Sequence, residues 1–176
     1  MAQTYTSANT SINNVKLPAL YNKVNLVGHV LDYGCGKYTD HIRKKALLTA
    51  SSFWCYDKYN QSVTTNLSSI DFGYAYGFDT ILCANVLNVI DDDITIIEII
   101  HRLIRMARKT GDIFIQIYEG DKTGEGKPTK EDCFQRNEPV KAYGRFLNQI
   151  DTYTFNTEYK GNIIHIYNVK SIFDRG

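Results

Sequence analysis

Two glycines and an aspartate in the first third of the chain have a spacing that suits a ribose-bearing ligand. The segment VLDYGCGKYTDHI, residues 30–42, runs from apolar residues into Gly34 and Gly36 and continues as a helical pattern. Neither glycine has a Cβ, so a ligand can approach the backbone closely there. Asp57 closes the next apolar segment, FWCYD, where a dinucleotide-type fold places an acidic side chain on the ribose hydroxyls. These residues predict a cofactor that contains a ribose.

The same loop separates two classes of ribose-bearing cofactor. A dinucleotide loop carries a third glycine for close packing of helix on strand, and Thr39 occupies that position. Asp32 stands two positions before the first glycine, and its carboxylate would repel a pyrophosphate but attract an amino-acid ammonium. S-adenosylmethionine has such an ammonium and no phosphate. The loop is therefore interpreted as a site for the methionine end of S-adenosylmethionine.

Composition and charge limit the class of protein. A chain of 176 residues suffices for one domain, and its net charge of +1 argues against a nucleic-acid coat protein. No apolar run approaches the roughly 20 residues that span a bilayer, and the polar start MAQTYTSANTSINN is not a secretory signal. The cysteines and histidines are scattered, so we expect no disulfide framework, no metal site and a reducing, cytoplasmic location.

The order of apolar and amphipathic segments predicts the secondary structure. Strands are expected at 30–33, 53–57, 79–85 and 112–118, with a closing pair near 152–158 and 162–168 joined around Lys160-Gly161-Asn162. Helices are expected at 39–49, in the run DDDITIIEIIHRLIRMARKTG as far as Gly111, and at 133–149. The stretch 58–78 has no firm periodicity, and a degenerate helix with a short third strand is expected there.

This alternation of strands and helices is typical of a three-layer α/β sandwich. We expect a mostly parallel sheet with helices on both faces, to which the final pair adds an antiparallel last strand. A single domain over residues 1–176 is expected, with residues 1–27 as an N-terminal segment. Within that segment, residues 5–25 are expected to lie over the cofactor or substrate mouth.

The motifs together resemble one known family. VLDYGCGKYTD resembles motif I of the class I S-adenosylmethionine-dependent methyltransferases, and FWCYDKYN resembles their acidic motif after strand 2. FDTILCANVLNVIDDD is similar to their strand-4 motif and GDIFIQIYEGD to their strand-5 segment, so the resemblance covers about residues 28–120. Small, uncharacterised methyltransferases of bacterial and phage genomes are also similar. The resemblance implies a Rossmann-like methyltransferase fold with a reversed last strand, Asp32, Gly34 and Gly36 around the methionine moiety, and Asp57 on the ribose.

The candidate site residues fall into three groups. Candidate cofactor-binding residues are Asp32, Tyr33, Gly34, Cys35, Gly36, Tyr38, Asp57, Lys58, Asp71, Phe72 and Asn85. Candidate catalytic residues, which would orient an acceptor or take its proton, are Asn85, Asn88, Glu119 and Asp121. Candidate substrate-binding residues are Tyr118, Glu119 and Tyr143.

Within these groups, particular residues have particular expected tasks. Tyr38 replaces a glycine usual in motif I, so its ring is expected to shape the pocket. Asp71 and Phe72 are the candidates for adenine contact. Tyr118 and Glu119 follow directly on a central strand, where functional loops cluster.

Plainer roles are open for several of the same residues. Asp57 also fits a turn or helix cap, and Asn85 and Asn88 also fit a turn after their strand. The segment YEGDKTGEGKPTKEDCFQRN also fits a solvated loop. The basic runs HIRKK and RLIRMARK are interpreted as solvated helix faces.

The acceptor and the class of activity stay open at this point. The expected strand 4 ends in CANV, so the Asp-Pro-Pro-Tyr type motif of amino-methylating nucleic-acid enzymes is absent, and no Pro-Cys nucleophile is present. A nucleic-acid acceptor is therefore not indicated, though not excluded. A small molecule, or a macromolecule recognised through a partner, suits so short a chain. Two other classes are a module that binds S-adenosylmethionine without transferring its methyl group and a nucleotide-linked oxidoreductase.

Overall fold

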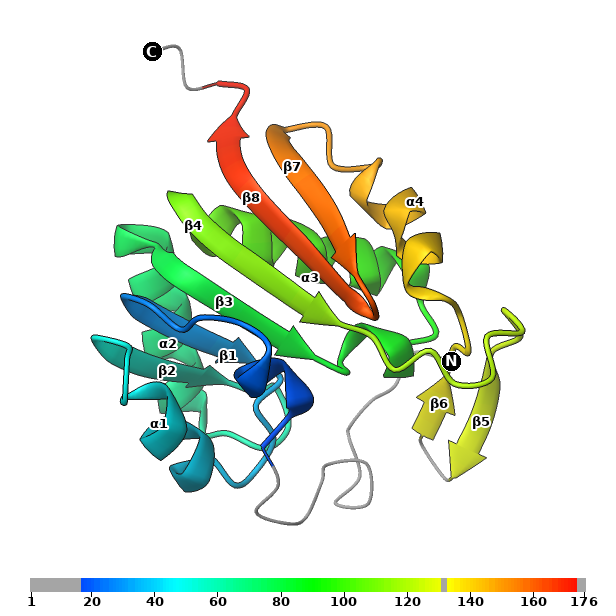
Figure 1. Cartoon of the computed structure of the whole chain (residues 1–176), viewed down its shortest axis with the longest axis horizontal. Coiled ribbons are helices and arrows are strands. Elements are labelled where there is room, and N and C mark those ends of the chain that lie inside the picture. Colours follow the sequence, from blue (N-terminus) through cyan, green and yellow to red (C-terminus); the bar gives the residue numbers. More distant parts are fainter. Residues whose placement is uncertain (1–16, 131–132, 174–176) are drawn as a thin grey trace.

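A six-stranded sheet forms the centre of the computed structural model, which describes residues 17–130 and 133–173. Its strand order is β2-β1-β3-β4-β8-β7, and Figure 1 shows the strands side by side. The bounds are β1 (His29–Tyr33), β2 (Ser52–Tyr56), β3 (Phe78–Ala84), β4 (Ala107–Gln116), β7 (Tyr153–Lys160) and β8 (Ile163–Ser171). The first four are parallel, and β8 is antiparallel to both of its neighbours. The predicted mostly parallel sheet with an antiparallel closing strand is confirmed.

Helices cover both faces of this sheet. One face carries α1 (Asp40–Ala46) and the short turn η1 (Ala19–Asn22), and the other carries α2 (Val63–Tyr76), α3 (Asp93–Met106) and α4 (Gly144–Leu147). Figure 1 shows α2 and α3 behind the sheet. Successive residues of β1 face opposite layers, so Val30 belongs to the core layer that contains Ile42 of α1, while Leu31 belongs to the layer that contains Ile100 of α3. No helix of the described residues is both long and apolar enough to cross a membrane.

The sequence of α3 explains its position under the sheet. Ile96, Ile100 and Leu103 recur at helical spacing and are fully buried. Asp92 caps the first turn, where its Oδ2 accepts a hydrogen bond from the backbone N–H of Thr95 at 2.7 Å. The helix begins where the aspartate run predicted, and its buried face fixes α3 against β3 and β4.

The predicted end of α3 at Gly111 is wrong. The helix ends at Met106, and β4 begins at Ala107. A Cβ on Gly111 would lie 2.6 Å from the carbonyl oxygen of Phe78, so this glycine allows β4 to lie close to β3. The basic residue Arg108 pairs with Asp79 at 2.8 Å across the two strands instead of ending a helix.

The predicted third strand within 58–78 is absent from the described residues, which form the single helix α2 there. Ser62 caps this helix by accepting a hydrogen bond from the backbone N–H of Thr65 at 3.0 Å. As a result β2 is an edge strand, and helix side chains satisfy its outer carbonyls. Arg43 donates to the carbonyl of Phe53 at 3.0 Å, and the Ser69 hydroxyl donates to that of Cys55 at 2.6 Å.

The predicted helix at 133–149 is also wrong. The segment begins as β6 (Cys133–Gln135), which pairs antiparallel with β5 (Lys127–Lys130), and only then forms η3 (Val140–Tyr143) and α4. Asn137 has a positive φ of 56°, and Pro139 lacks a backbone N–H, so no continuous helix can pass through this point. The expected final hairpin is confirmed, with β7 and β8 joined at Gly161.

Candidate functional site

A cavity of about 610 Å³ opens at the carboxyl ends of β1, β2 and β3. Ligands of open parallel sheets bind at this edge. The predicted site residues that line the cavity are Tyr33, Gly34, Cys35, Gly36, Tyr38, Asp57, Lys58, Asn85, Asn88 and Tyr118. Those that do not line it are Asp32, Asp71, Phe72, Glu119, Asp121 and Tyr143.

The two glycines of the β1 loop hold backbone shapes that other residues would strain. Gly34 has a φ of +81°, and a Cβ there would lie 2.2 Å from Cγ2 of Val86. Gly36 has a φ of +74°, and its carbonyl accepts a hydrogen bond from Nε2 of Gln61 at 2.7 Å. The loop is thus fixed from two sides, by the segment after β3 and by the turn after β2.

Asp57 joins the glycine loop to the turn after β2. Its Oδ2 accepts from the backbone N–H of Gly36 at 2.9 Å. Its Oδ1 accepts from the N–H groups of Tyr59 and Asn60 and from Nδ2 of Asn60, at 2.9 to 3.0 Å. The turn role considered from the sequence is therefore observed. Because Oδ2 has one protein donor, it keeps the capacity to accept a second hydrogen bond from a ligand.

Asp32 does not line the cavity, and its side chain lies on the face of β1 opposite to that of Tyr33, toward η1. Its carboxylate is buried, and Oδ2 accepts a hydrogen bond from the hydroxyl of Tyr21 at 2.6 Å. Burial is the main cause that raises the pKa of Asp32 to about 7; the hydrogen bond from Tyr21 opposes this shift, and the charge of Asp57 adds to it. Of the N-terminal segment expected to lie over the mouth, residues 1–16 are outside the described chain, and Pro18 lines the cavity.

Asp32→Asn is expected to make folding less sensitive to pH. A carboxyl of the unfolded chain titrates near pH 4, so between about pH 4 and pH 7 the folded protein holds a proton that the unfolded chain has lost. The wild-type free energy of unfolding should therefore fall as pH rises through this window. Asparagine still accepts from Tyr21 and carries no charge. Urea titrations should find the variant more stable at about pH 8, by on the order of 3 kcal/mol, and near equality at about pH 4.

If the wild type and Asp32→Asn instead lose stability in parallel between about pH 4 and pH 7, a group other than Asp32 causes the fall of the free energy of unfolding with pH. Tyr21→Phe, which removes the hydroxyl but keeps the ring, is the matched control. In this variant the free energy of unfolding should fall more with rising pH than in the wild type, because the hydrogen bond from Tyr21 stabilises the charged carboxylate of Asp32.

Asn88 ties three segments together beside the cavity. It lies in the turn η2 (Leu87–Val89) and is 2% exposed. Its Nδ2 donates to Oε1 of Gln135 at 3.2 Å, and its Oδ1 accepts from the N–H of Tyr118 at 3.3 Å. Gln135 in turn donates to the carbonyl of Tyr118 at 3.0 Å. Asn88 thus positions the end of β4 and the β5–β6 hairpin, while Asn85, with a φ of +58°, is exposed at the cavity.

Glu119 and Asp121 are occupied within their own loop. Glu119 accepts from the N–H of Val140 and pairs with Lys122, both at 2.8 Å, and the hydrogen bond from Lys122 lowers the pKa of Glu119. A hydrogen bond from Thr123 lowers the pKa of Asp121 to about 2. Both carboxylates therefore stabilise the loop outside the cavity, as the solvated-loop alternative predicted.

The remaining predicted residues, which do not line the cavity, lie in the hydrophobic core or on the protein surface. Phe72 stacks on Trp54 with ring centroids 4.3 Å apart, because α2 turns it toward β2 and turns Asp71 outward. Tyr143 is fully buried against Phe146. Neither aromatic ring reaches the cavity that the sequence led us to expect.

Sequence reasoning missed the cavity residues of α3 and of the β5–β6 hairpin, which are Thr95, Glu98, Ile99, Arg102, Thr129, Phe134 and Gln135. Arg102 was assigned to a solvated face, but its Nη1 donates to the hydroxyls of Tyr33 at 3.2 Å and Tyr56 at 3.3 Å. Positions 95, 98, 99 and 102 have helical spacing, which was the available signal. The sequence of the β5–β6 hairpin gave no comparable signal, since a helix was expected over residues 133–149.

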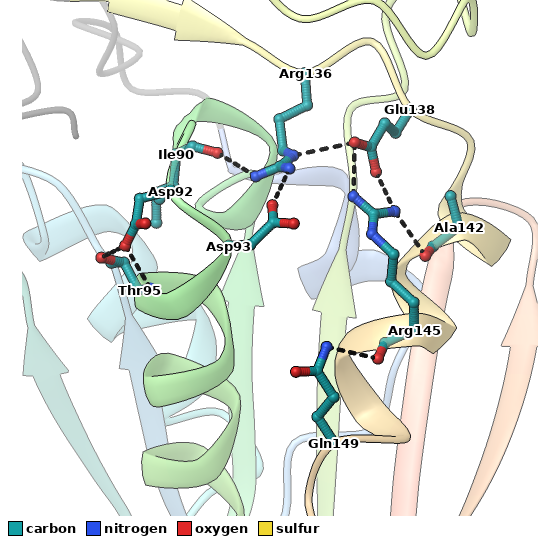
Figure 2. A network of polar contacts seen from close by, with 9 residues as sticks. All are labelled: Ile90, Asp92, Asp93, Thr95, Arg136, Glu138, Ala142, Arg145 and Gln149. Carbon is teal, nitrogen blue, oxygen red and sulfur yellow. Dashed lines mark hydrogen bonds and ion pairs between the residues drawn. The ribbon is translucent and has the colours of Figure 1, made fainter. Parts of the chain in front are cut away.

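A buried arginine fastens the hairpin to the start of α3. Figure 2 shows Arg136 donating to the carbonyl of Ile90 at 2.9 Å and pairing with Asp93 and Glu138. Glu138 also pairs with Arg145 at 2.7 Å. Because Gln135 precedes Arg136 directly, this network sets the position of one wall of the cavity.

Comparisons with known proteins establish the fold. No family model and no curated protein matches the sequence. The structure of a DhpI–SAH complex superposes with a TM-score of 0.53 at 10% identity, over 87% of this chain and 81% of that one. A SAM-dependent methyltransferase from Leishmania major superposes with a TM-score of 0.50 at 15% identity, over 82% of this chain and 65% of that one. The chain therefore has the class I methyltransferase fold that its motifs implied.

Proposed function

We propose that the chain binds S-adenosylmethionine in the cavity and transfers its methyl group to an acceptor. The observation that carries this proposal is the junction of the glycine loop with Asp57, through the 2.9 Å hydrogen bond from Gly36. It lies at the carboxyl edge of a sheet with methyltransferase topology. The two solved structures with the same fold support it, since one is a SAH complex and the other a SAM-dependent methyltransferase.

The cavity residues fit this cofactor. A cavity of about 610 Å³ falls within the usual size of small-molecule sites, roughly 300 to 1,000 Å³. Asp57 can accept from a ribose hydroxyl through Oδ2, and the ammonium groups of Lys37 and Lys58 at the rim attract a carboxylate. The glycines leave the loop backbone open to the ligand, and Tyr38 is a half-exposed ring beside it.

When bound, S-adenosylmethionine supplies an electrophilic methyl group on a sulfonium sulfur. The contribution of the chain is then positioning, which accounts for much of the acceleration in such displacements. Asn85 is placed to orient an acceptor, while Tyr118 and Phe134 narrow the cavity from the side of β4 and the hairpin. Asn88 acts through Tyr118 and Gln135, so it is a positioning residue.

The acceptor that we propose is a small molecule, or a macromolecule presented by a partner. Thr129, Phe134 and Gln135 of the β5–β6 hairpin line the cavity, and we assign them to the side that would receive the acceptor. Incubation with radiolabelled S-adenosylmethionine and either the small-molecule or the macromolecular fraction of a bacterial extract should show label transfer in one of the two.

Calorimetric titration of the wild type tests the cofactor directly. S-adenosylmethionine and S-adenosylhomocysteine are expected to bind with dissociation constants on the order of micromolar, and NADH is not expected to bind. Binding of NADH alone would overturn the proposal in favour of an oxidoreductase. Binding of both sulfur compounds without label transfer to either fraction would leave a binding module in place of an enzyme.

A further inference from the structure

Strand β7 ends the main sheet with an outer edge whose backbone groups no described segment satisfies. At the opposite edge, side chains of Arg43 and Ser69 donate to the outer carbonyls of β2. In the part of the chain that the structure describes, no strand or loop bonds to the outer side of β7. An edge with free N–H and C=O groups is a template for a further strand.

The hydrogen bonds of β8 identify the free groups of β7. The carbonyl of Asn162 accepts from the N–H of Ile117 at 2.9 Å, so Asn162 and every second residue after it bond toward β4. The residues between them, such as His165, bond toward β7, where the partner of His165 is Glu158. The even-numbered residues of β7 are therefore paired with β8. The groups that point outward belong to Phe155, Thr157 and Tyr159.

The irregularity of this hairpin lies in β8, so β7 itself is regular. Thr154 is the partner of Lys170, and Asn156 is the partner of Tyr167, so β8 has one more residue than β7 between these pairs. Asn168, with a φ of 55°, accommodates this bulge. The eight residues of β7 therefore alternate without interruption, which is what pairing with a further strand requires.

A groove of about 480 Å³ leaves space for the side chains of a further strand. It lies between β7 and α4, and Figure 1 shows α4 on the outer side of β7. Phe155, Thr157 and Tyr159 line it from the strand, and Gly144 and Leu147 line it from α4. Gly144 has no side chain to fill this space, since a Cβ there would lie 3.1 Å from the hydroxyl of Tyr159.

We propose that β7 pairs antiparallel with β7 of a second copy of this chain, about a two-fold axis at Thr157. The axis is perpendicular to the sheet and joins the two six-stranded sheets into one continuous sheet. On the side of α4, Phe155 then faces Tyr159 of the second copy, and such aromatic pairs across strands are stabilising. On the other side, the Asn156 amide faces the Glu158 carboxylate of the second copy and can donate to it.

The charges of β7 favour this register and this partner. The strand has one acidic and one basic residue, Glu158 and Lys160. An axis at Glu158 would place two carboxylates opposite each other, which is unfavourable. With the axis at Thr157, Lys160 faces Thr154 of the second copy and no like charges are opposed. A second copy therefore supplies a strand of equal length, free outer groups and complementary charge.

Gel filtration with light scattering tests the pairing on the wild-type chain. We expect a mass of twice 20.1 kDa and a dissociation constant on the order of 10 µM, because a single strand pair is a small interface. Thr157→Lys should weaken the dimer at least about 10-fold, since two ammonium groups then meet on the axis, and Thr157→Glu should do the same with two carboxylates. An equimolar mixture of the two variants should dimerise again, because opposite charges then face each other.

Val63→Lys is the matched control. Val63 is 75% exposed on α2, so the same charge is added at another apolar surface position, and this variant should dimerise like the wild type. Circular dichroism would verify that each variant is folded. A monomeric wild type, a dimer that persists in Thr157→Lys, or a mixture that stays monomeric would overturn the inference. Loss of the dimer in Val63→Lys alone would assign the interface to α2 and overturn it as well. The cofactor proposal is independent of these results, since β7 and α4 do not line the 610 Å³ cavity.

Discussion

Asp57→Ala is expected to abolish binding of S-adenosylmethionine and S-adenosylhomocysteine in calorimetric titration, with affinity at least about 100-fold weaker. The carboxylate accepts from the N–H of Gly36, the N–H groups of Tyr59 and Asn60, and Nδ2 of Asn60. Its removal leaves these donors unpaired and releases the glycine loop from the turn after β2. The free energy of unfolding should fall by roughly 3 kcal/mol, because the bonds to a charged acceptor are lost from a site only 7% exposed.

Asp79→Ala separates the two effects of this substitution. Asp79 also accepts from a backbone N–H, that of His29 at 2.7 Å, and pairs with Arg108, but it lies outside the cavity. This variant should lose stability while keeping the wild-type affinity for S-adenosylhomocysteine. Binding by Asp57→Ala within about threefold of the wild type would show that the carboxylate serves the turn alone.

The site residues that the sequence could predict are those whose role depends on the conformation of their own short segment. Gly34, Gly36 and Asp57 are recognisable because a strand that ends in a tight loop needs particular residue types at fixed positions. Gly36 and Asp57 are joined by a hydrogen bond because β1 and β2 are parallel neighbours, so the segments after both strands lie at the same edge of the sheet. The six strands of the main sheet and the final hairpin were predictable for the same reason, since alternation and turn residues are features of short segments of sequence.

The side chains that sequence misplaced depend on packing between distant segments. Asp32 was expected beside a ligand, but Tyr21 of the N-terminal segment occupies its carboxylate. Tyr143 was expected to line a substrate cleft, but its ring is buried in the core beside Phe146. Arg102 resembled a solvated cation until the positions of Tyr33 and Tyr56 were known. The partners of Asp32 and Arg102 lie more than ten residues away along the chain, so local patterns carry no sign of them.

The β5–β6 hairpin shows the same limit for a whole element. Cys133, Phe134 and Gln135 suit a helix or a strand equally well, and the choice is made by pairing with Lys127 and Pro128. This short ribbon does not pair with the main sheet, and a side-chain network together with the backbone hydrogen bond from Arg136 to the carbonyl of Asn88 holds it against the domain. Arg136, which follows the hairpin and does not itself line the cavity, is therefore expected to support the position of this wall.

Arg136→Ala is accordingly expected to lower the free energy of unfolding by about 3 kcal/mol, since it removes a buried guanidinium that donates to the carbonyl of Ile90 and pairs with Asp93 and Glu138. The loss of the guanidinium over the ring of Phe146, 5.4 Å away, adds to this cost.

Arg145→Ala is the matched control for this network. Arg145 also pairs with Glu138 and covers Phe146, but its side chain is 41% exposed, so removing it should cost about 1 kcal/mol or less. Urea titration measures both values, and limited proteolysis should cleave the segment between β4 and β6 faster in Arg136→Ala alone. Equal losses in the two variants would mean that the hairpin is held by Asn88 and Gln135 without the arginine. The wall of the cavity would then be independent of α3, and Arg136→Ala should leave the affinity for S-adenosylhomocysteine unchanged.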